Sequence, residues 1–164
     1  MVNGMNRLKD IVVEIDSSTF RNWVVPDNSV LAREFKVEHE LKGLKYFTDL
    51  NHFINAVKGG KIISVDDNLD RKILRRSRTS TFDSLFRLIS TYRSYPEFRN
   101  EKTLQAIYDG FKTNKPMEMP IVLNLPNNKL SIFSGNTRMD VAFQLGITPK
   151  VILISVNNVG NKND

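Results

Sequence analysis

The sequence predicts a mixed α/β fold of the α+β class, in which helices flank a small mixed sheet. Short apolar runs typical of strands occur along the 164 residues, and apolar residues recur at helical spacing between them. A hydrophobic fraction of 40% is enough for a core. No apolar run approaches the roughly 18 residues needed to span a bilayer. Cysteine is absent, so we expect a cytoplasmic protein without disulfides or thiolate metal sites.

The first 70 residues are expected to form an α/β extension. Residues 8–15 are typical of a short strand, and residues 16–30 are typical of a loop because they combine proline, aspartate, asparagine and serine. The segment 35–41 alternates between apolar and polar side chains, which predicts a half-buried strand. Its predicted buried face consists of Phe35, Val37, His39 and Leu41.

A helix, a strand and a turn are predicted to complete this extension. Apolar residues at helical spacing predict the helix over residues 47–58. Gly59-Gly60 is expected to end it, because glycine accepts the left-handed conformation of a C-cap. Residues 61–65 predict a strand, and Asp66-Asp67-Asn68 predicts a turn.

A basic segment then leads into a second predicted domain, residues 71–156. Residues 71–99 contain seven arginines and one lysine against two carboxylates, so they hold the whole net charge of +6. Helices are predicted over residues 82–92 and 101–112. The planar fork of arginine suits phosphate oxygens, so we expect nucleic acid or nucleotide to be the partner of this segment. The alternative is a solvated basic face. The expected nucleic-acid contacts are Arg71, Lys72, Arg75, Arg76 and Arg78.

The C-terminal part predicts a hairpin, a helix and a buried strand. The hairpin joins strands 121–125 and 130–133 through a turn rich in asparagine. The helix is predicted over residues 136–145, with Gly146 as its stop, and the continuously apolar run 151–156 is typical of a buried strand. The polar tail, residues 157–164, is expected to be disordered.

The turn Ser134-Gly135-Asn136-Thr137-Arg138 is predicted to bind phosphate. Glycine between a strand and a helix permits a tight turn and a close approach to a ligand. The first amides of the helix lack internal acceptors and, with the helix dipole, favour an anion. The two hydroxyls can add donors, and the arginine can fork onto phosphate oxygens. In the alternative reading, Asn136 is an ordinary N-cap and Arg138 is solvated.

The stretch 119–123 (MPIVL), together with 130–147 (LSIFSGNTRMDVAFQLGI), resembles the ParB/sulfiredoxin superfamily. In that superfamily a helix precedes a Pro-Ile strand and a hairpin. A G-x-x-R turn then opens a helix that ends in Leu-Gly. The match covers roughly residues 100–156. The resemblance implies that Gly135, Asn136, Thr137 and Arg138 hold nucleotide phosphates, and the GNTR form of the turn is similar to that of bacteriophage-encoded members.

Two positions depart from the pattern of the superfamily. Sulfiredoxins carry their catalytic cysteine where this chain has Asn136, so sulfinic acid reduction is excluded. The chromosome-partitioning ParB proteins have two adjacent arginines in the turn, and Thr137 occupies the place of the first. This substitution places their CTP-dependent switch in doubt for this chain.

Phosphoryl chemistry would require a cation and a positioned base, so Mg²⁺ and a nucleoside triphosphate are the expected cofactors of an enzyme. Glu118 and Asp140 are the carboxylates closest in sequence to the turn, and they are the candidate catalytic residues. The alternatives are a purely structural Glu118 and a solvated Asp140. No P-loop, nucleophile elbow or HExxH zinc motif occurs.

Three functions follow from these features. The first is a ParB-like protein of DNA metabolism that binds the phosphates of a nucleotide or of DNA, with nuclease-like cleavage as one form of this role. The second is a triphosphate-dependent phosphotransferase or another enzyme of nucleotide or modified-base metabolism. The third is a non-catalytic interaction protein whose turn has lost its ligand.

Overall fold

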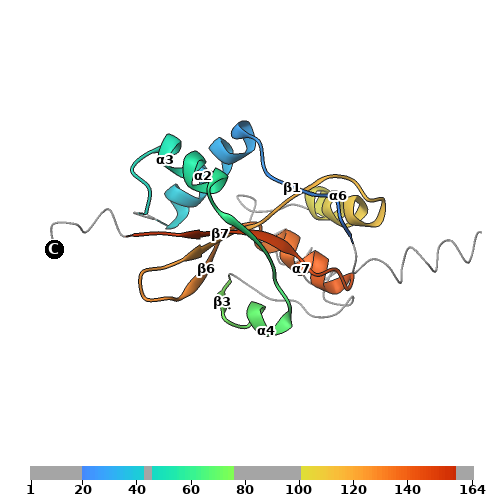
Figure 1. Ribbon diagram of the computed structural model, residues 1–164. Coiled ribbons are helices and arrows are strands. Elements are labelled where there is room, and N and C mark those ends of the chain that lie inside the picture. The colour runs from blue at the N-terminus through green and yellow to red at the C-terminus, as the bar shows by residue number, and fades with distance from the viewer. Residues whose placement is uncertain (1–19, 43–45, 76–100, 158–164) are drawn as a thin grey trace, which may run out of the picture. The chain divides into compact units, whose positions relative to one another are not determined.

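A computed structural model describes residues 20–42, 46–75 and 101–157, and it confirms the α+β class (Figure 1). Its helices are α2 (Asn28–Lys42), α3 (Leu50–Lys58), α4 (Asp67–Asp70), α6 (Glu101–Lys112) and α7 (Asn136–Gln144). Its strands are β1 (Trp23–Val24), β2 (Lys61–Ser64), β3 (Ile73–Leu74), β4 (Met117–Glu118), β5 (Ile121–Asn124), β6 (Leu130–Ser134) and β7 (Lys150–Ser155). Within the described ranges, no helix is both long and apolar enough to traverse a bilayer.

Five strands form a mixed sheet in the order β2-β7-β5-β6-β3. Strand β5 pairs parallel with β7 and antiparallel with β6, while β2 is antiparallel to β7 and β3 is parallel to β6. Ile121, Val122 and Leu123 in β5 are all buried, as expected for a central strand. The predicted strands at 61–65, 121–125, 130–133 and 151–156 are confirmed to within two residues, and so is the helix at 101–112. The two-residue strands β1, β3 and β4 were not predicted.

The chain divides into two compact units that interleave along the sequence. Of the residues that the structure describes, one unit takes 20–23, 101–117 and 137–148, and the other takes 24–42, 46–75, 118–136 and 149–157. Strand β2 comes from the expected N-terminal extension and pairs with β7 from the expected second domain. The predicted strand at 8–15, the predicted helix at 82–92 and tail residues 158–164 lie outside the described residues.

An aromatic cluster lies in the first of these units. Phe20, Trp23 and Phe111 pack edge to face, with ring centroids 5.1–5.5 Å apart. In the same unit α7 ends as predicted at Gly146, which has a φ of +73°. The Ile147 N–H then donates to the Ala142 carbonyl at 2.8 Å, a bond that closes the end of the helix.

Helix α2 replaces the predicted strand at 35–41, so that prediction was wrong. Seven residues of alternation fit a strand, but the preceding Asp27 provides a helix cap. Its Oδ1 accepts the Val30 N–H at 2.9 Å, and its carbonyl accepts the Leu31 N–H. Leu31, Phe35 and Glu38 then face inward at the spacing of a helix, whereas Val37 is exposed.

Phenylalanines join α2 and α3 to the sheet. Phe53 and Phe133 are fully buried, with ring centroids 4.9 Å apart, and Phe35 lies 5.2 Å from Phe53. Phe47 packs edge-on against both buried rings. Apolar burial of this kind stabilises the fold and holds the two helices against one face of the sheet.

The ends of α3 and α4 differ in detail from the sequence predictions. Asp49 caps α3 by accepting the His52 N–H, and Asp66 caps α4 by accepting the Leu69 N–H, so the predicted turn at 66–68 opens a short helix. Gly59 ends α3 with a φ of −90°, so the predicted left-handed C-cap was wrong. Gly60 is needed for packing, because a Cβ there would lie 2.6 Å from Ile152.

The Asp27 cap predicts a pH dependence of α2. The Val30 N–H bond, followed by the Ser29 hydroxyl bond, holds the pKa of Asp27 below its ordinary value of 3.8. A lowered folded-state pKa contributes stability above the unfolded pKa, and this is lost as pH falls through the folded pKa. We therefore expect α2 to weaken as the pH drops below 3.8. Asp27→Asn should lack this acid-dependent loss of stability when the free energy of unfolding is measured against pH. If wild type and variant lose stability alike below pH 3.8, the Asp27 cap does not contribute as described.

Candidate phosphate-binding turn

The predicted turn lies where β6 ends and α7 begins. Ser134 is the last residue of β6 and pairs with Ile121 of β5, and Asn136 is the first residue of α7. Gly135 between them has a φ of +95°, a left-handed conformation that favours glycine. A Cβ on Gly135 would lie 2.6 Å from the Cβ of Pro120. The predicted close approach of the glycine is therefore to Pro120.

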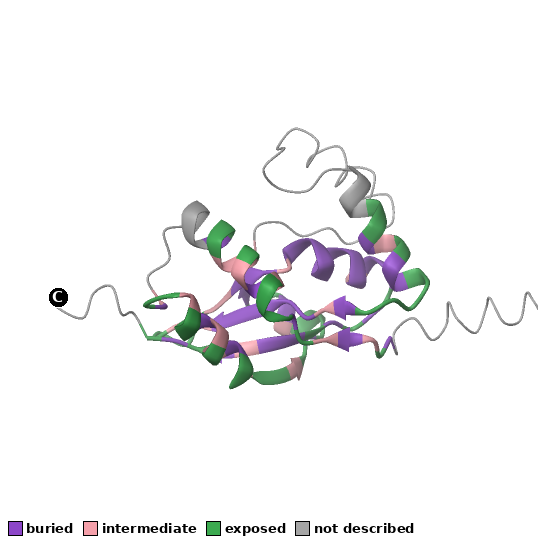
Figure 2. Ribbon diagram, turned by 90° about the horizontal axis from the view of Figure 1, so that it is seen from above, coloured by how far each residue is buried: buried purple, intermediate pink, exposed green. Residues whose placement is uncertain are grey.

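The side chains of the turn are enclosed. Ser134 is 6% exposed, and Asn136, Thr137 and Arg138 are each 5% exposed, whereas Gly135 is half-buried. The predicted alternative of a solvated Arg138 was therefore wrong. Burial continues along the helix through Ala142 (Figure 2). Gly135 is thus the part of the turn most accessible to solvent.

A serine hydroxyl in this enclosed turn lacks a hydrogen bond. The Oγ of Ser134 is buried and finds no donor or acceptor among the residues that the structure describes. A buried hydroxyl without a partner costs about 1–3 kcal/mol relative to a satisfied one. Native proteins rarely leave such groups unpaired, and a polar ligand is one kind of partner that satisfies them.

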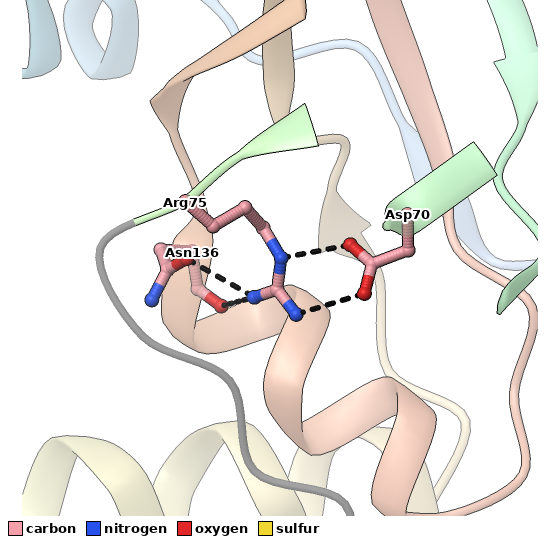
Figure 3. A network of polar contacts seen from close by, with 3 residues as sticks. All are labelled: Asp70, Arg75 and Asn136. Carbon is pink, nitrogen blue, oxygen red and sulfur yellow. Dashed lines mark hydrogen bonds and ion pairs between the residues drawn. The ribbon is translucent and has the colours of Figure 1, made fainter. Parts of the chain in front are cut away.

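A buried arginine directly after β3 contacts the first residue of α7. The Nε of Arg75 donates to Asp70 Oδ1 at 2.8 Å, and its Nη2 donates to Oδ2 at 3.1 Å (Figure 3). Its Nη1 donates to the Asn136 side-chain Oδ1 at 3.0 Å and lies 3.5 Å from the Asn136 carbonyl. The Arg75 side chain is 1% exposed. The amide of Asn136 therefore serves as an acceptor for Arg75.

The other predicted nucleic-acid contacts divide into two groups. Arg71 and Lys72 follow α4 and are exposed, as a phosphate contact requires. Arg75 instead points inward to Asp70 and Asn136, while Arg76 and Arg78 lie outside the described residues. Sequence reasoning did not foresee the role of Asp70, because its spacing of five residues from Arg75 matches no regular helix or strand pairing.

The two predicted catalytic carboxylates lie in different environments. Glu118 is half-buried in β4. Asp140 is fully buried in α7, so the predicted alternative of a solvated helix residue was wrong. In the part of the chain that the structure describes, no group of three or more histidine or carboxylate side chains has the arrangement of a metal site.

No protein-family model, no curated protein and no solved structure matches this chain. The similarity to the ParB/sulfiredoxin superfamily therefore stays a prediction that rests on the turn and the order of the elements around it.

Proposed function

We propose that this protein binds a phosphate group of a nucleotide or of DNA at the turn 134–138. The observation that supports this most directly is the Ser134 hydroxyl, which is buried and without a partner in the described structure. It stands one residue before the left-handed Gly135 and two before the first residue of α7. Phosphate-binding turns place N–H donors from the start of a helix around the anion, and the helix dipole is positive at that end. A nearby hydroxyl can add a further donor.

The enclosure of the turn favours a tightly held anion. Charge-assisted hydrogen bonds are stronger where water is excluded. Thr137 and Arg138 follow directly in the chain and supply a hydroxyl and a guanidinium in the first turn of α7. Because Gly135 is the most accessible residue of the turn, we expect the phosphate to approach beside it.

A role in DNA metabolism is the form of this function that we favour. Arg71 and Lys72 are exposed cations in the same unit as Arg75, whose guanidinium contacts the first residue of α7. Exposed cations can bind further phosphates of a polynucleotide, and the similarity of the turn to ParB-like proteins points in the same direction. Binding of DNA through these side chains should weaken steeply as salt rises.

Thermal unfolding with a panel of ligands tests the proposal. The panel consists of nucleoside triphosphates, deoxynucleoside triphosphates and short DNA, each with and without Mg²⁺. A ligand bound only by the folded state raises the unfolding temperature, and the stabilisation grows with the logarithm of the ligand concentration above the Kd. A Mg²⁺ requirement with one triphosphate would favour the enzyme alternative, and a salt-sensitive effect of DNA would favour the DNA-binding form.

Ser134→Ala is the decisive variant in this assay. It removes one hydroxyl donor to a charged ligand, so affinity should fall about tenfold or more while the fold is kept. Ser131→Ala is the matched control, because Ser131 lies in the same strand three residues from the turn. If no phosphate compound stabilises the protein, or if both variants bind like the wild type, the turn is not the binding site.

A further inference from the structure

A concave site lies at the end of β5 opposite the turn. A cavity of about 180 Å³ is bordered by α3, the residues that precede it and the end of β7. Its apolar walls include Phe47, Ala56 and Ile154, and its polar rim includes His52 and Ser155. All of these residues belong to one compact unit, so their arrangement is internal to that unit.

The hydrogen bonds of His52 determine which polar group its ring offers. The backbone N–H of Thr48 donates to His52 Nδ1 at 2.9 Å. An imidazole nitrogen that accepts a hydrogen bond carries no proton, so the proton of the neutral ring resides on Nε2. His52 lines the cavity, so its ring can offer this N–H donor to an occupant, and its centroid lies 5.5 Å from that of the edge-on Phe47 ring.

The cavity volume is close to that of a site for a single ring. An apolar cavity of about 150 Å³ holds one benzene molecule, whereas sites for drug-sized ligands occupy about 300–1,000 Å³. The polar groups of His52 and Ser155 favour an occupant that can form hydrogen bonds over a purely hydrocarbon one. Aromatic walls favour a flat π-system.

From these features we infer a binding site for a six-membered heteroaromatic ring with carbonyl acceptors, the chemistry of a pyrimidine base. One ring carbonyl accepts the His52 Nε2–H, and the ring packs against the aromatic side chains. The polar groups of Ser155 and Asn157 at the rim both donate and accept, so they can match the remaining edge of the base.

This site is independent of the phosphate-binding turn. Strand β5 runs from Ile121, which pairs with Ser134, to Asn124, which pairs with Ser155. The two sites thus lie at opposite ends of β5, about 10 Å apart along a strand with a rise of about 3.3 Å per residue. Failure of one assignment leaves the other untouched, because different side chains form each site.

Titration of the full chain with thymidine, cytidine and adenosine, followed by NMR, tests the inference. We expect saturable binding of a pyrimidine nucleoside, with a shift of the His52 Nε2 resonance, and binding of adenosine at least tenfold weaker. If neither thymidine nor cytidine binds saturably, the inference is wrong. Equal binding of adenosine would overturn it too, because a purine exceeds the single-ring volume.

Two variants locate the binding. Ala56→Leu fills the cavity from its wall and should reduce pyrimidine affinity at least tenfold, while Ala106→Leu on the exposed side of α6 should leave it unchanged. His52→Phe keeps a flat ring but removes the donor, so affinity should fall about tenfold. Thermal unfolding of each variant confirms that it is folded. Unaltered affinity in a folded Ala56→Leu variant would contradict the site.

Discussion

Arg75→Ala is expected to lower the free energy of unfolding by about 3–5 kcal/mol, the cost of breaking a buried ion pair by removing one partner. The substitution leaves the buried Asp70 carboxylate without its bidentate guanidinium and takes a donor from Asn136. Urea unfolding of the variant measures this loss. Arg71→Ala is the matched control, because Arg71 is exposed and its removal should change stability by no more than about 0.5 kcal/mol.

A second pair of variants separates the charge from the packing. Arg75→Lys keeps a cation but loses the planar fork, so it should restore only part of the stability. The double variant Arg75→Met with Asp70→Leu removes both charges and should be clearly more stable than Arg75→Ala, because no buried carboxylate is left without the Arg75 guanidinium. Equal stability of Arg75→Ala and Arg71→Ala would show that Arg75 is not buried against Asp70.

Gly135→Ala is expected to cost at least about 2 kcal/mol of stability. The left-handed conformation costs a residue with a Cβ about 1–2 kcal/mol, and overpacking against Pro120 adds about 1–3 kcal/mol. The relevant geometry is the φ of +95° and the 2.6 Å approach to the Pro120 Cβ. Thermal or urea unfolding measures the change.

Gly59→Ala provides the control for this substitution. Gly59 has a φ of −90°, and a Cβ there would come no closer than 3.6 Å to any neighbouring atom. Alanine at such a position reduces the entropy of the unfolded chain and is neutral or slightly stabilising. If both variants unfold like the wild type, the turn at Gly135 does not have the described conformation.

Local patterns predicted most of the described fold but not α2. Strands with continuous apolar runs, such as β5 and β7, and helices with a clear stripe, such as α6, follow directly from the sequence. The segment 35–41 alternates with the period of a strand, but the Asp27 cap and the buried Leu31 start a helix that continues through it. The two-residue strands have too few residues for any period to be visible.

The position of the candidate site was predictable, but its surroundings were not. A glycine between β6 and α7 identifies the turn, and the structure places it there. The burial of Arg138 and Asp140, the approach of Pro120 and the Asp70–Arg75 pair arise from tertiary packing. Pro120 and Gly135 are distant in sequence, and the five-residue spacing of Asp70 and Arg75 matches no regular helix or strand pairing, so one sequence alone contains no periodic signal for these contacts.

The backbone amide resonances of Gly135, Asn136 and Thr137 test phosphate binding at the turn most directly. During titration with the nucleoside triphosphate or DNA that stabilises the protein, these amides should show the largest shifts, and the shifts should saturate with the affinity found by unfolding. The same titration of Ser134→Ala should saturate at about tenfold higher ligand concentration. Saturable binding that leaves these amides unshifted would contradict the account.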